Sequence, residues 1–592
     1  MILPTSYFSG RIGTNYDPSP GERDEIRELI LGREKRLQAI QDEISKLQEE
    51  QNEVKVFIEN HRTLVSPIRR LHADILREIF HRCIPERLPR CRAQEAPLLL
   101  TRVCRAWREV TIATPSLWNR IHISLPRPYD PPITDKFRSL VRAWEEGIEM
   151  WLERSGRMPL ELSFSAEDAT RGWSVSIDWS MDGESGAELE RLYASVARRL
   201  LAHASRWKSI SLNAPTIVWE TLASLTDDLP LLEKIDTGCS THFAMQATDH
   251  YQPVTVLVRR SPSLRVLHSQ EAFSHLPVRW EFLTEVVLAE PSVSTPVYLS
   301  QAMEVLSSSS ASLRHYTVSA RIDPENPLPT VSPVTLPDLV TLNIEISEGR
   351  LGLGFETITA ALRQIFDTIS TPKLAHLCVV LSRHRLGAEH ISDSFDKLPF
   401  LDSLDHSGCT LQSLSLDLPV TAGALLHLLA GMSSLKQLRL QMSGASRYRF
   451  SARPPSPFPD TIIDALTPSS TNTDVLCPNL EVFMHGYCSS SSANSLLAFA
   501  EARRRESEYS NVHVRRLKRL QVHLDRFIEN TELSLRLKAL RTEGMLIQWV
   551  SPSNRRDEIV AGYREPVMTG FHEYVHSTEM WWPILPYSPT HY

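Results

Sequence analysis

The hydrophobic positions between residues 30 and 58 follow an alternating spacing of three and four residues. The stripe is formed by Ile30, Leu37, Ile40, Ile44, Leu47, Val54 and Ile58, with polar Arg33 and Gln51 at two further positions of the same stripe. Charged and amide residues fill the intervals. This pattern predicts an amphipathic helix over residues 22–61 with a coiled-coil seam about four heptads long. Two interpretations remain open: a homodimer through residues 22–61, or a single helix that docks its stripe on the next domain.

The residues before this helix have a different character. Residues 1–21 hold three prolines, three glycines and no hydrophobic period, which predicts a disordered lead.

A compact segment, residues 62–125, has short runs with helical periodicity. Leu71, Ile75, Leu76, Ile79 and Phe80 share one helical face, and Val103, Cys104 and Trp107 share another. Prolines at 97 and 115 mark turns between the runs. We expect a small all-α module of about three short helices, which buries a modest core and leaves apolar side chains in need of a partner.

A proline-rich linker, residues 126–134, precedes a recurring phrase. The phrase is a leucine, two residues, a second apolar residue, one residue and a third apolar residue. Copies begin at Trp207, Leu264, Leu283, Leu339, Leu374, Leu411, Leu435 and Leu517, and poorer copies at Leu232, Leu313 and Leu480.

These copies predict a repeat architecture. They are spaced 19 to 45 residues apart, with amphipathic helical stretches such as residues 187–204 and 355–369 between them. Strand and helix alternating at this period indicate a right-handed, irregular leucine-rich-repeat-like α/β solenoid over residues 135–550. Residues 551–592 are an aromatic, proline-containing tail. The predicted fold class is therefore mostly α/β, with the helix and the all-α module in front.

Composition and charge exclude several classes of function. The net charge of −7 makes no global basic field for nucleic acid. Between Arg62 and Arg120, however, arginine outnumbers acidic residues by twelve to five, a patch that an acidic protein partner explains at least as well. The longest apolar stretch is too short to span a bilayer, and the N-terminus lacks the layout of a secretory signal. The eight cysteines form no C-x-x-C pair, as expected of buried thiols in a reducing compartment. We expect an intracellular protein of the cytoplasm, the nucleus or both, binding neither nucleic acid nor membrane.

Catalytic motifs are almost absent. The chain has no phosphate-binding glycine loop and no nucleophile elbow. One H-E-x-x-H motif runs from His572 to His576, and on a helix it would place two imidazoles over zinc with Glu573 as general base. It lacks a helical period and a suitably placed third ligand. We expect no enzyme, no metal and no cofactor, with a zinc hydrolase as the minor alternative.

Segment 64–125 resembles an F-box, in the form abundant in proteins of mushroom-forming fungi. The resemblance rests on Pro67-Ile68-Arg-Arg-Leu71, Ile75-Leu76-Arg-Glu-Ile79-Phe80, Val103-Cys104-Arg-Ala-Trp107 and Pro115-Ser-Leu117-Trp118. Downstream, MWLERSGRMPLELSF and LLAHASRWKSISL look like the phrases that open the repeat region of those proteins. One departure is that His72 and Asp74 stand where the family's L-P-x-E phrase has proline and glutamate.

The resemblance implies a substrate-recognition adaptor of an SCF-type ubiquitin ligase. Its F-box would bind the Skp-type adaptor, and through it a cullin, while the concave strand face of the repeat region would bind an unknown protein substrate. An adaptor-binding scaffold without a role in ubiquitination is the alternative. By position, the resemblance implies that the adaptor contacts are Leu64, Pro67, Ile68, Leu71, Ile75, Leu76, Ile79, Phe80, Val103 and Trp107. Some of these residues must instead form the module's own core, and Trp107 is the foremost candidate for such a structural role.

Overall fold

The structure is a computed structural model of the whole chain, and part of the chain can be described in detail. The described residues are 6–65, 67–124, 133–165, 184–213, 216–237, 251–269, 276–288, 297–323, 332–347, 355–382, 394–440, 460–469, 474–488, 492–509, 512–524 and 531–550. They belong to two compact units, residues 1–81 and 82–592. The tail from 551 to 592, with the H-E-x-x-H motif, lies outside the described residues, as do linker residues 126–132.

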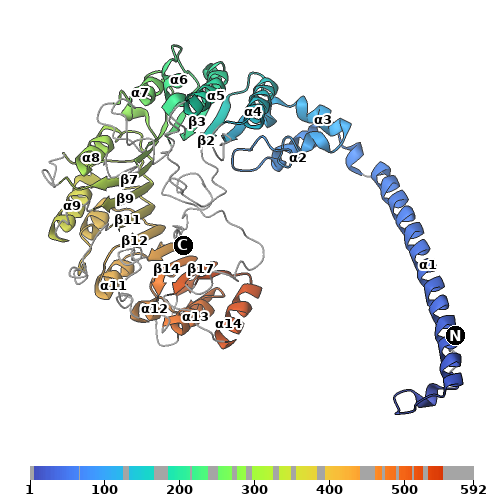
Figure 1. Cartoon of the computed structure of the whole chain (residues 1–592). Coiled ribbons are helices and arrows are strands. Elements are labelled where there is room, and N and C mark those ends of the chain that lie inside the picture. Colours follow the sequence, from blue (N-terminus) through green and yellow to red (C-terminus); the bar gives the residue numbers. More distant parts are fainter. Residues whose placement is uncertain are drawn as a thin grey trace. The chain divides into compact units, whose positions relative to one another are not determined.

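The first unit is dominated by one long helix. Helix α1 (Pro20–Val65) has 46 residues and is continuous (Figure 1). It contains the whole stripe that predicts a coiled coil. Every residue from Arg27 to Arg62 is exposed.

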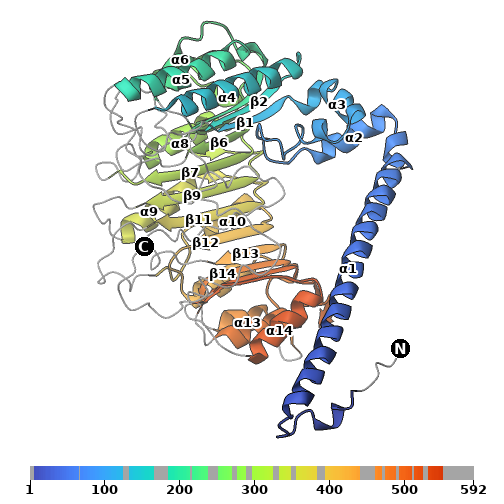
Figure 2. The same cartoon turned by 45° about the vertical axis from the view of Figure 1, so that its right-hand side comes forward.

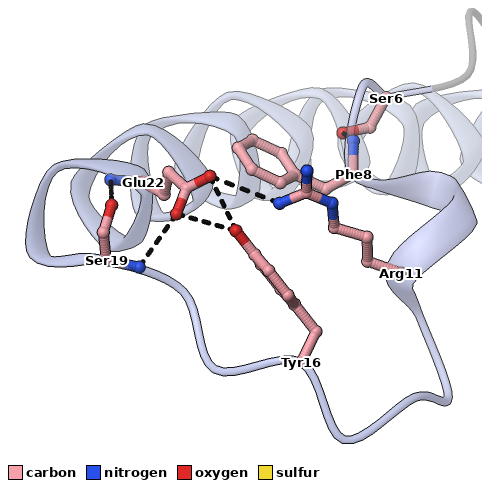
Figure 3. Close-up of polar contacts among 6 residues, drawn as sticks. All are labelled: Ser6, Phe8, Arg11, Tyr16, Ser19 and Glu22. Atoms are coloured by element: carbon pink, nitrogen blue, oxygen red, sulfur yellow. Dashed lines mark hydrogen bonds and ion pairs between the residues drawn. The ribbon is translucent and has the colours of Figure 1, made fainter.

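The start of α1 is capped by the residues in front of it. Ser19 and Glu22 form a reciprocal capping box: the backbone N–H of Ser19 donates to Glu22 Oε2 at 2.9 Å, and the backbone N–H of Glu22 donates to Ser19 Oγ at 3.5 Å. The Tyr16 hydroxyl donates to the Glu22 carboxylate at 2.8 Å, and Arg11 Nη1 lies 3.3 Å from the same group (Figure 3). The Ser19 N–H, the Tyr16 hydroxyl and Arg11 lower the pKa of Glu22 to about 2. Composition predicts a disordered lead for residues 1–21, whereas residues 6–19 include a short 3₁₀ helix, η1 (Ser9–Arg11), and this cap.

Two short helices follow α1. The 3₁₀ helix η2 (Pro67–Arg70) leads into α2 (Ala73–Cys83), which crosses from the first unit into the second. In the second unit, η3 (Leu100–Arg102), α3 (Arg105–Ile112) and η4 (Pro115–Leu117) complete the helical part of segment 62–125.

The second unit is built on one parallel sheet. Among the described residues this sheet has fourteen strands, which follow chain order from one edge to the other. They are β1 (Arg120–Ser124), β2 (Leu160–Ser165), β3 (Trp207–Asn213), β4 (Lys234–Thr237), β5 (Val266–Ser269), β6 (Glu285–Leu288), β7 (His315–Arg321), β9 (Thr341–Ser347), β11 (His376–Ser382), β12 (Ser413–Asp417), β13 (Gln437–Leu440), β14 (Val482–Cys488), β17 (Arg519–Leu524) and β18 (Leu546–Val550). Two small pairs, β8 (Val334–Thr335) with β10 (Ile369–Ser370) and β15 (Ser507–Tyr509) with β16 (Val512–Val514), lie outside it.

Helices connect the strands and lie along one face of the sheet (Figures 1 and 2). They are α4 (Asp135–Arg154), α5 (Glu184–Leu201), α6 (Thr216–Ala223), α7 (Tyr251–Arg259), α8 (Leu299–Ser308), α9 (Phe355–Thr368), α10 (Leu401–Ser407), α11 (Ala422–Ala430), α12 (Asp460–Leu466), α13 (Ala493–Ala502) and α14 (Thr531–Thr542). The predicted leucine-rich-repeat-like α/β solenoid is confirmed.

The recurring phrase forms the core of this solenoid. Its first residue is at most 6% exposed in all eleven copies. Its second residue occupies one continuous row across the paired strands, because the registers align these positions from strand to strand. The row, extended at both ends by residues outside the eleven copies, is Ile121, Leu162, Ile210, Ile235, Leu267, Val286, Tyr316, Leu342, Leu377, Leu414, Leu438, Phe483, Leu520 and Ile547.

A row of backbone hydrogen bonds joins the repeats just before each strand. The N–H of Lys436 donates to the carbonyl of Gln412 at 2.8 Å, that of Glu481 to Lys436 at 2.8 Å, and that of Lys518 to Glu481 at 2.7 Å. The same bond recurs along the sheet. Each repeat therefore provides a hydrogen-bond acceptor for a backbone N–H in the turn of the next repeat, as expected when stacked repeats stabilise one another.

The first edge of the sheet is closed by the end of the predicted all-α module. Residues 120–124 form strand β1, so the module is not purely helical: Trp118, Ile121 and Ile123 repeat the spacing of the phrase, and all are fully buried. Trp118 packs edge-on against Trp151 of α4 with ring centroids 5.0 Å apart, and its Nε1 donates to the carbonyl of Thr111 at 2.9 Å. Helix α3 is thereby fixed to the first repeat.

We predict that Leu414→Ala destabilises the solenoid by about 2–5 kcal/mol, because Leu414 is fully buried in the middle of the row and its truncation leaves a cavity. The midpoint of urea unfolding measures the loss. Leu535→Ala on α14 is the matched control, since Leu535 is 63% exposed and its truncation should shift stability by less than about 0.5 kcal/mol. Equal effects of the two substitutions would contradict the role of the row.

Candidate functional site

Segment η2–α2 presents apolar side chains to solvent. Ile75 and Ile79 lie one helical turn apart on α2, and Ile75 is 51% exposed. Pro67 and Ile68 on η2 are also exposed, and Leu71 and Ile79 are half-buried. We call these five residues the η2–α2 apolar face. All five belong to the first unit.

A second face of α2 packs into the protein core. Leu76 is 5% exposed and Phe80 is fully buried, because each follows an isoleucine of the apolar face by one residue and so points about 100° further round the helix. These two predicted adaptor contacts are therefore core residues in this chain and are left out of the apolar face.

The other predicted contacts are divided between the two units. Val103, which is 55% exposed, and half-buried Trp107 belong to the second unit, where Leu99 is 45% exposed nearby in sequence. The Trp107 carbonyl accepts from Thr111 Oγ1 at 2.7 Å. The Leu64 side chain lies outside the described residues.

His72, which stands where the F-box L-P-x-E phrase has proline, lies at the start of α2. Its Nδ1 lies 3.4 Å from the backbone N of Asp74 and 3.1 Å from the Asp74 carboxylate. A neutral ring can accept from the N–H, and a protonated ring can pair with the carboxylate. His72 thus caps the first turn of α2 with its side chain, as polar residues at N-cap positions commonly do. Asp74 also forms an ion pair with Arg77 on the next turn.

The second candidate surface is the sheet face opposite the leucine row. Side chains alternate along a strand, so the residue after each row member points to this face. Most of these residues are polar. In strand order they are His122, Ser163, Ser211, Asp236, His268, Val287, Thr317, Asn343, Cys378, Ser415, Arg439, Met484, Gln521 and Gln548. We call this surface the strand face.

Three charged side chains on the neighbouring strands β4, β5 and β6 form a buried triad on the strand face. His268 on β5 is fully buried, its Nε2 lies 2.9 Å from Glu285 Oε1 on β6, and its Nδ1 lies 3.8 Å from Asp236 Oδ2 on β4. Burial alone would lower the pKa of His268, but the two carboxylates outweigh it and raise this pKa. Burial alone would raise the pKa of Glu285, but the His268 hydrogen bond and charge outweigh it and lower this pKa.

Other groups on this face are held neutral by burial. Burial lowers the pKa of His376 to about 4 and raises the pKa of the Cys378 thiol to about 11. A thiol of this kind is a poor nucleophile at neutral pH. Cys378 and Met484 instead form a small apolar cluster with Val380 and Val482. The strand face thus combines charged, polar and apolar positions, most of which are buried within the chain; His122, Ser163, Ser211, Asn343 and Gln548 are the partly exposed ones.

Comparison with known proteins adds no family. No protein-family model and no curated protein matches this chain. The likeness to an F-box therefore rests on the residues quoted above.

Among the described helices, none combines the length and the apolar composition that a membrane span requires. Within the described part of the chain, no three His, Cys, Asp or Glu side chains are grouped so that they could hold a metal ion.

We predict that the stabilisation supplied by the His268 triad is greatest between about pH 4.5 and 6.5. The lowered pKa of Glu285 gives stability that is present above its ordinary value of 4.5 and is lost as pH falls. The raised pKa of His268 gives stability that is complete below 6.5 and is lost as pH rises through the folded-state pKa. The difference in urea midpoint between the natural chain and His268→Gln, measured against pH, should peak in this window.

The matched control for this measurement is His427→Gln, because His427 is exposed on α11. It should give a small difference with no maximum. A His268→Gln difference that stays constant or grows from pH 6 to pH 9 would show that His268 is not charged in the folded protein.

Proposed function

We propose that the chain is a substrate-recognition adaptor of an SCF-type ubiquitin ligase. The observation that carries this proposal is the η2–α2 apolar face, in which Ile68 and Ile75 remain 39% and 51% exposed within a segment that otherwise exposes charge. Contiguous exposed apolar residues on a folded protein favour a protein partner. The likeness of this segment to an F-box favours the Skp-type adaptor as that partner.

The size of the apolar face suits a stable complex. Complete burial of an isoleucine is worth about 1.5–3 kcal/mol, so each half-exposed isoleucine still has about 1 kcal/mol to gain. Two exposed isoleucines, with contributions from Pro67 and from the edges of Leu71 and Ile79, form the apolar centre that such interfaces need.

Arginines beside the apolar face favour an acidic partner. Arg69 and Arg70, both on η2, are exposed. Charge of one sign near an apolar centre raises the rate of encounter with a partner of opposite charge and gives the encounter a salt dependence. The salt dependence of adaptor association is a direct measure of this contribution.

The strand face is the surface we assign to the substrate. The positions a substrate could contact are the partly exposed polar residues of this face, His122, Ser163, Ser211, Asn343 and Gln548. The bond between ubiquitin and the substrate lysine would form at the conjugating enzyme that the cullin brings. The contribution of this chain would be proximity, which raises the effective concentration of substrate lysines near the activated ubiquitin.

We predict that Ile75→Asp weakens binding of the full chain to a purified Skp-type adaptor by about 30- to 1000-fold, equivalent to about 2–4 kcal/mol. The substitution removes apolar area and places a carboxylate where the complex excludes water. Because Ile75 is exposed in the free chain, the fold should be retained, which circular dichroism checks. Calorimetry gives the affinity.

Leu535→Asp makes the same kind of chemical change on exposed α14 and should leave adaptor binding unchanged. Equal binding by Ile75→Asp and the natural chain would remove the η2–α2 apolar face from the interface. Absence of any binding by the natural chain would overturn the proposal. A complex that binds the adaptor but never associates with a cullin would favour the scaffold alternative.

A further inference from the structure

The exposed stripe of α1 needs a cover. In proteins, most helical stability comes from packing of an amphipathic face against a neighbour. Yet Leu37, Ile44 and Leu47 are 58%, 48% and 57% exposed. The capping box at Ser19 and Glu22 sets where the helix begins and leaves the stripe uncovered.

Heptad positions can be assigned along the whole stripe. The a positions are Arg23, Ile30, Leu37, Ile44, Gln51 and Ile58, and the d positions are Ile26, Arg33, Ile40, Leu47, Val54 and His61. Each set contains four apolar and two polar residues. The pairing of the polar positions decides which geometry a second copy can adopt.

A parallel, in-register pair places every seam residue against its own copy. Arg33 would then face Arg33 of the second copy, and Arg23 would face Arg23. Like charges brought together at the centre of a seam are unfavourable.

An antiparallel pair removes this repulsion in one register. In antiparallel coiled coils an a residue faces a d residue of the other helix. When the two facing residue numbers sum to 84, all six a positions meet all six d positions. The apolar layers are then Ile30 with Val54, Leu37 with Leu47, Ile44 with Ile40 and Ile58 with Ile26.

The polar layers also match in this register. Gln51 faces Arg33 of the second copy, so a guanidinium meets an amide oxygen instead of another guanidinium. Arg23 faces His61 at the two ends of the seam. By symmetry each layer occurs twice, so polar residues meet only polar residues, and the layers between the two Gln51–Arg33 pairs are all apolar.

The flanking positions favour the same register on balance. Exposed Leu29 lies beside Phe57 of the second copy, which lengthens the apolar surface, and Arg36 lies beside Glu50. Two contacts oppose it: Glu43 approaches its own copy at the two-fold axis, and Arg27 approaches Lys55.

A parallel pair arranges the same flanking residues less well. Leu29 and Phe57 would lie beside Glu34 and Arg62, so the two largest flanking apolar side chains would meet charge. Glu50 would pair with Lys55, which is a favourable contact. By symmetry this contact occurs twice; each exposed ion pair is worth at most about 1 kcal/mol, and the two do not offset two arginine–arginine layers in the seam.

We propose that a second copy of this chain covers the α1 stripe as an antiparallel coiled coil in this register. The proposal is independent of adaptor binding. It assigns an occupant and an orientation to a surface that the spacing alone leaves open between dimerisation and docking within the chain.

Disulfide trapping of the full chain tests the orientation. We expect light scattering to report a dimer at micromolar concentration. When chains with Leu37→Cys are mixed with chains with Leu47→Cys, re-equilibrated and oxidised, a covalent dimer containing one chain of each kind should form. Chains with Leu37→Cys alone should not cross-link, because their sulfurs lie about 15 Å apart along the axis in the antiparallel register.

The unsubstituted chain, oxidised in parallel, reports any cross-link through the native cysteines, of which Cys83 and Cys104 are exposed. Covalent dimers from Leu37→Cys alone, above that background, would show a parallel pair and overturn the register. A monomer in light scattering would overturn the proposal altogether and favour docking within the chain.

A charge exchange gives a second readout that keeps the apolar seam intact. Arg36→Glu should weaken dimerisation about tenfold, because two attractive contacts become repulsive. Adding Glu50→Arg to the same chain should restore it, since the antiparallel register brings the two substituted positions together with their charges exchanged. Failure of the second substitution to rescue the first would contradict this register, because a parallel pair would instead place the new arginine beside Lys55.

Discussion

Burial of one row of side chains determines the rest of the solenoid. The second residue of each repeat, from Ile121 to Ile547, lies against the helical layer, and the strand registers keep these residues in one line. Because side chains alternate along a strand, a shift of one residue in any repeat would bring a residue such as Asp236 or His268 into the core. The same constraint therefore sets the core and sorts the polar residues onto the strand face.

The irregularity of the repeats follows from where this constraint applies. It acts on the turn and the strand, where the first residue of every phrase is buried and the backbone hydrogen bond to the previous repeat recurs. It does not act on the connections, so intervals of 19 to 45 residues are compatible with one sheet. Within the connections, individual side chains satisfy backbone groups that the repeat pattern leaves without a partner. Arg503, fully buried at the end of α13, donates to the carbonyls of Leu466, Leu476 and Cys477 and so satisfies the end of α12 and the next turn together.

Periodicity could predict the solenoid but not its ends. All eleven copies of the phrase contain strands of the sheet, because the regularly spaced leucines are the residues buried in the core. Strands β1, β2 and β18 were not among these copies. At β2 and β18 the first position holds Pro159 and Gly544, so the phrase is not recognisable there; β1 opens with Trp118, as β3 opens with Trp207, but stands alone behind a segment of helical spacing. The His268 triad could not be predicted either, since its three members lie on three strands and only the register brings them together. On α2, a one-residue difference in helical phase separates core Leu76 from exposed Ile75, and composition does not reveal this phase.

The boundary between the helical segment and the solenoid has a consequence for the proposed adaptor. Cys91 packs so closely on α4 that a side chain at Gly147 would come within 3.2 Å of its sulfur, and Trp118 fixes α3 to Trp151. Arg154, at the end of α4, lies over the Trp118 ring at 4.6 Å and adds a second contact between this ring and α4. Val103 and Trp107 are thus carried by the first edge of the sheet itself, with no flexible linker between them and the strand face. A partner that contacted Val103 would therefore be held at a fixed position relative to the strand face, since both belong to the second unit.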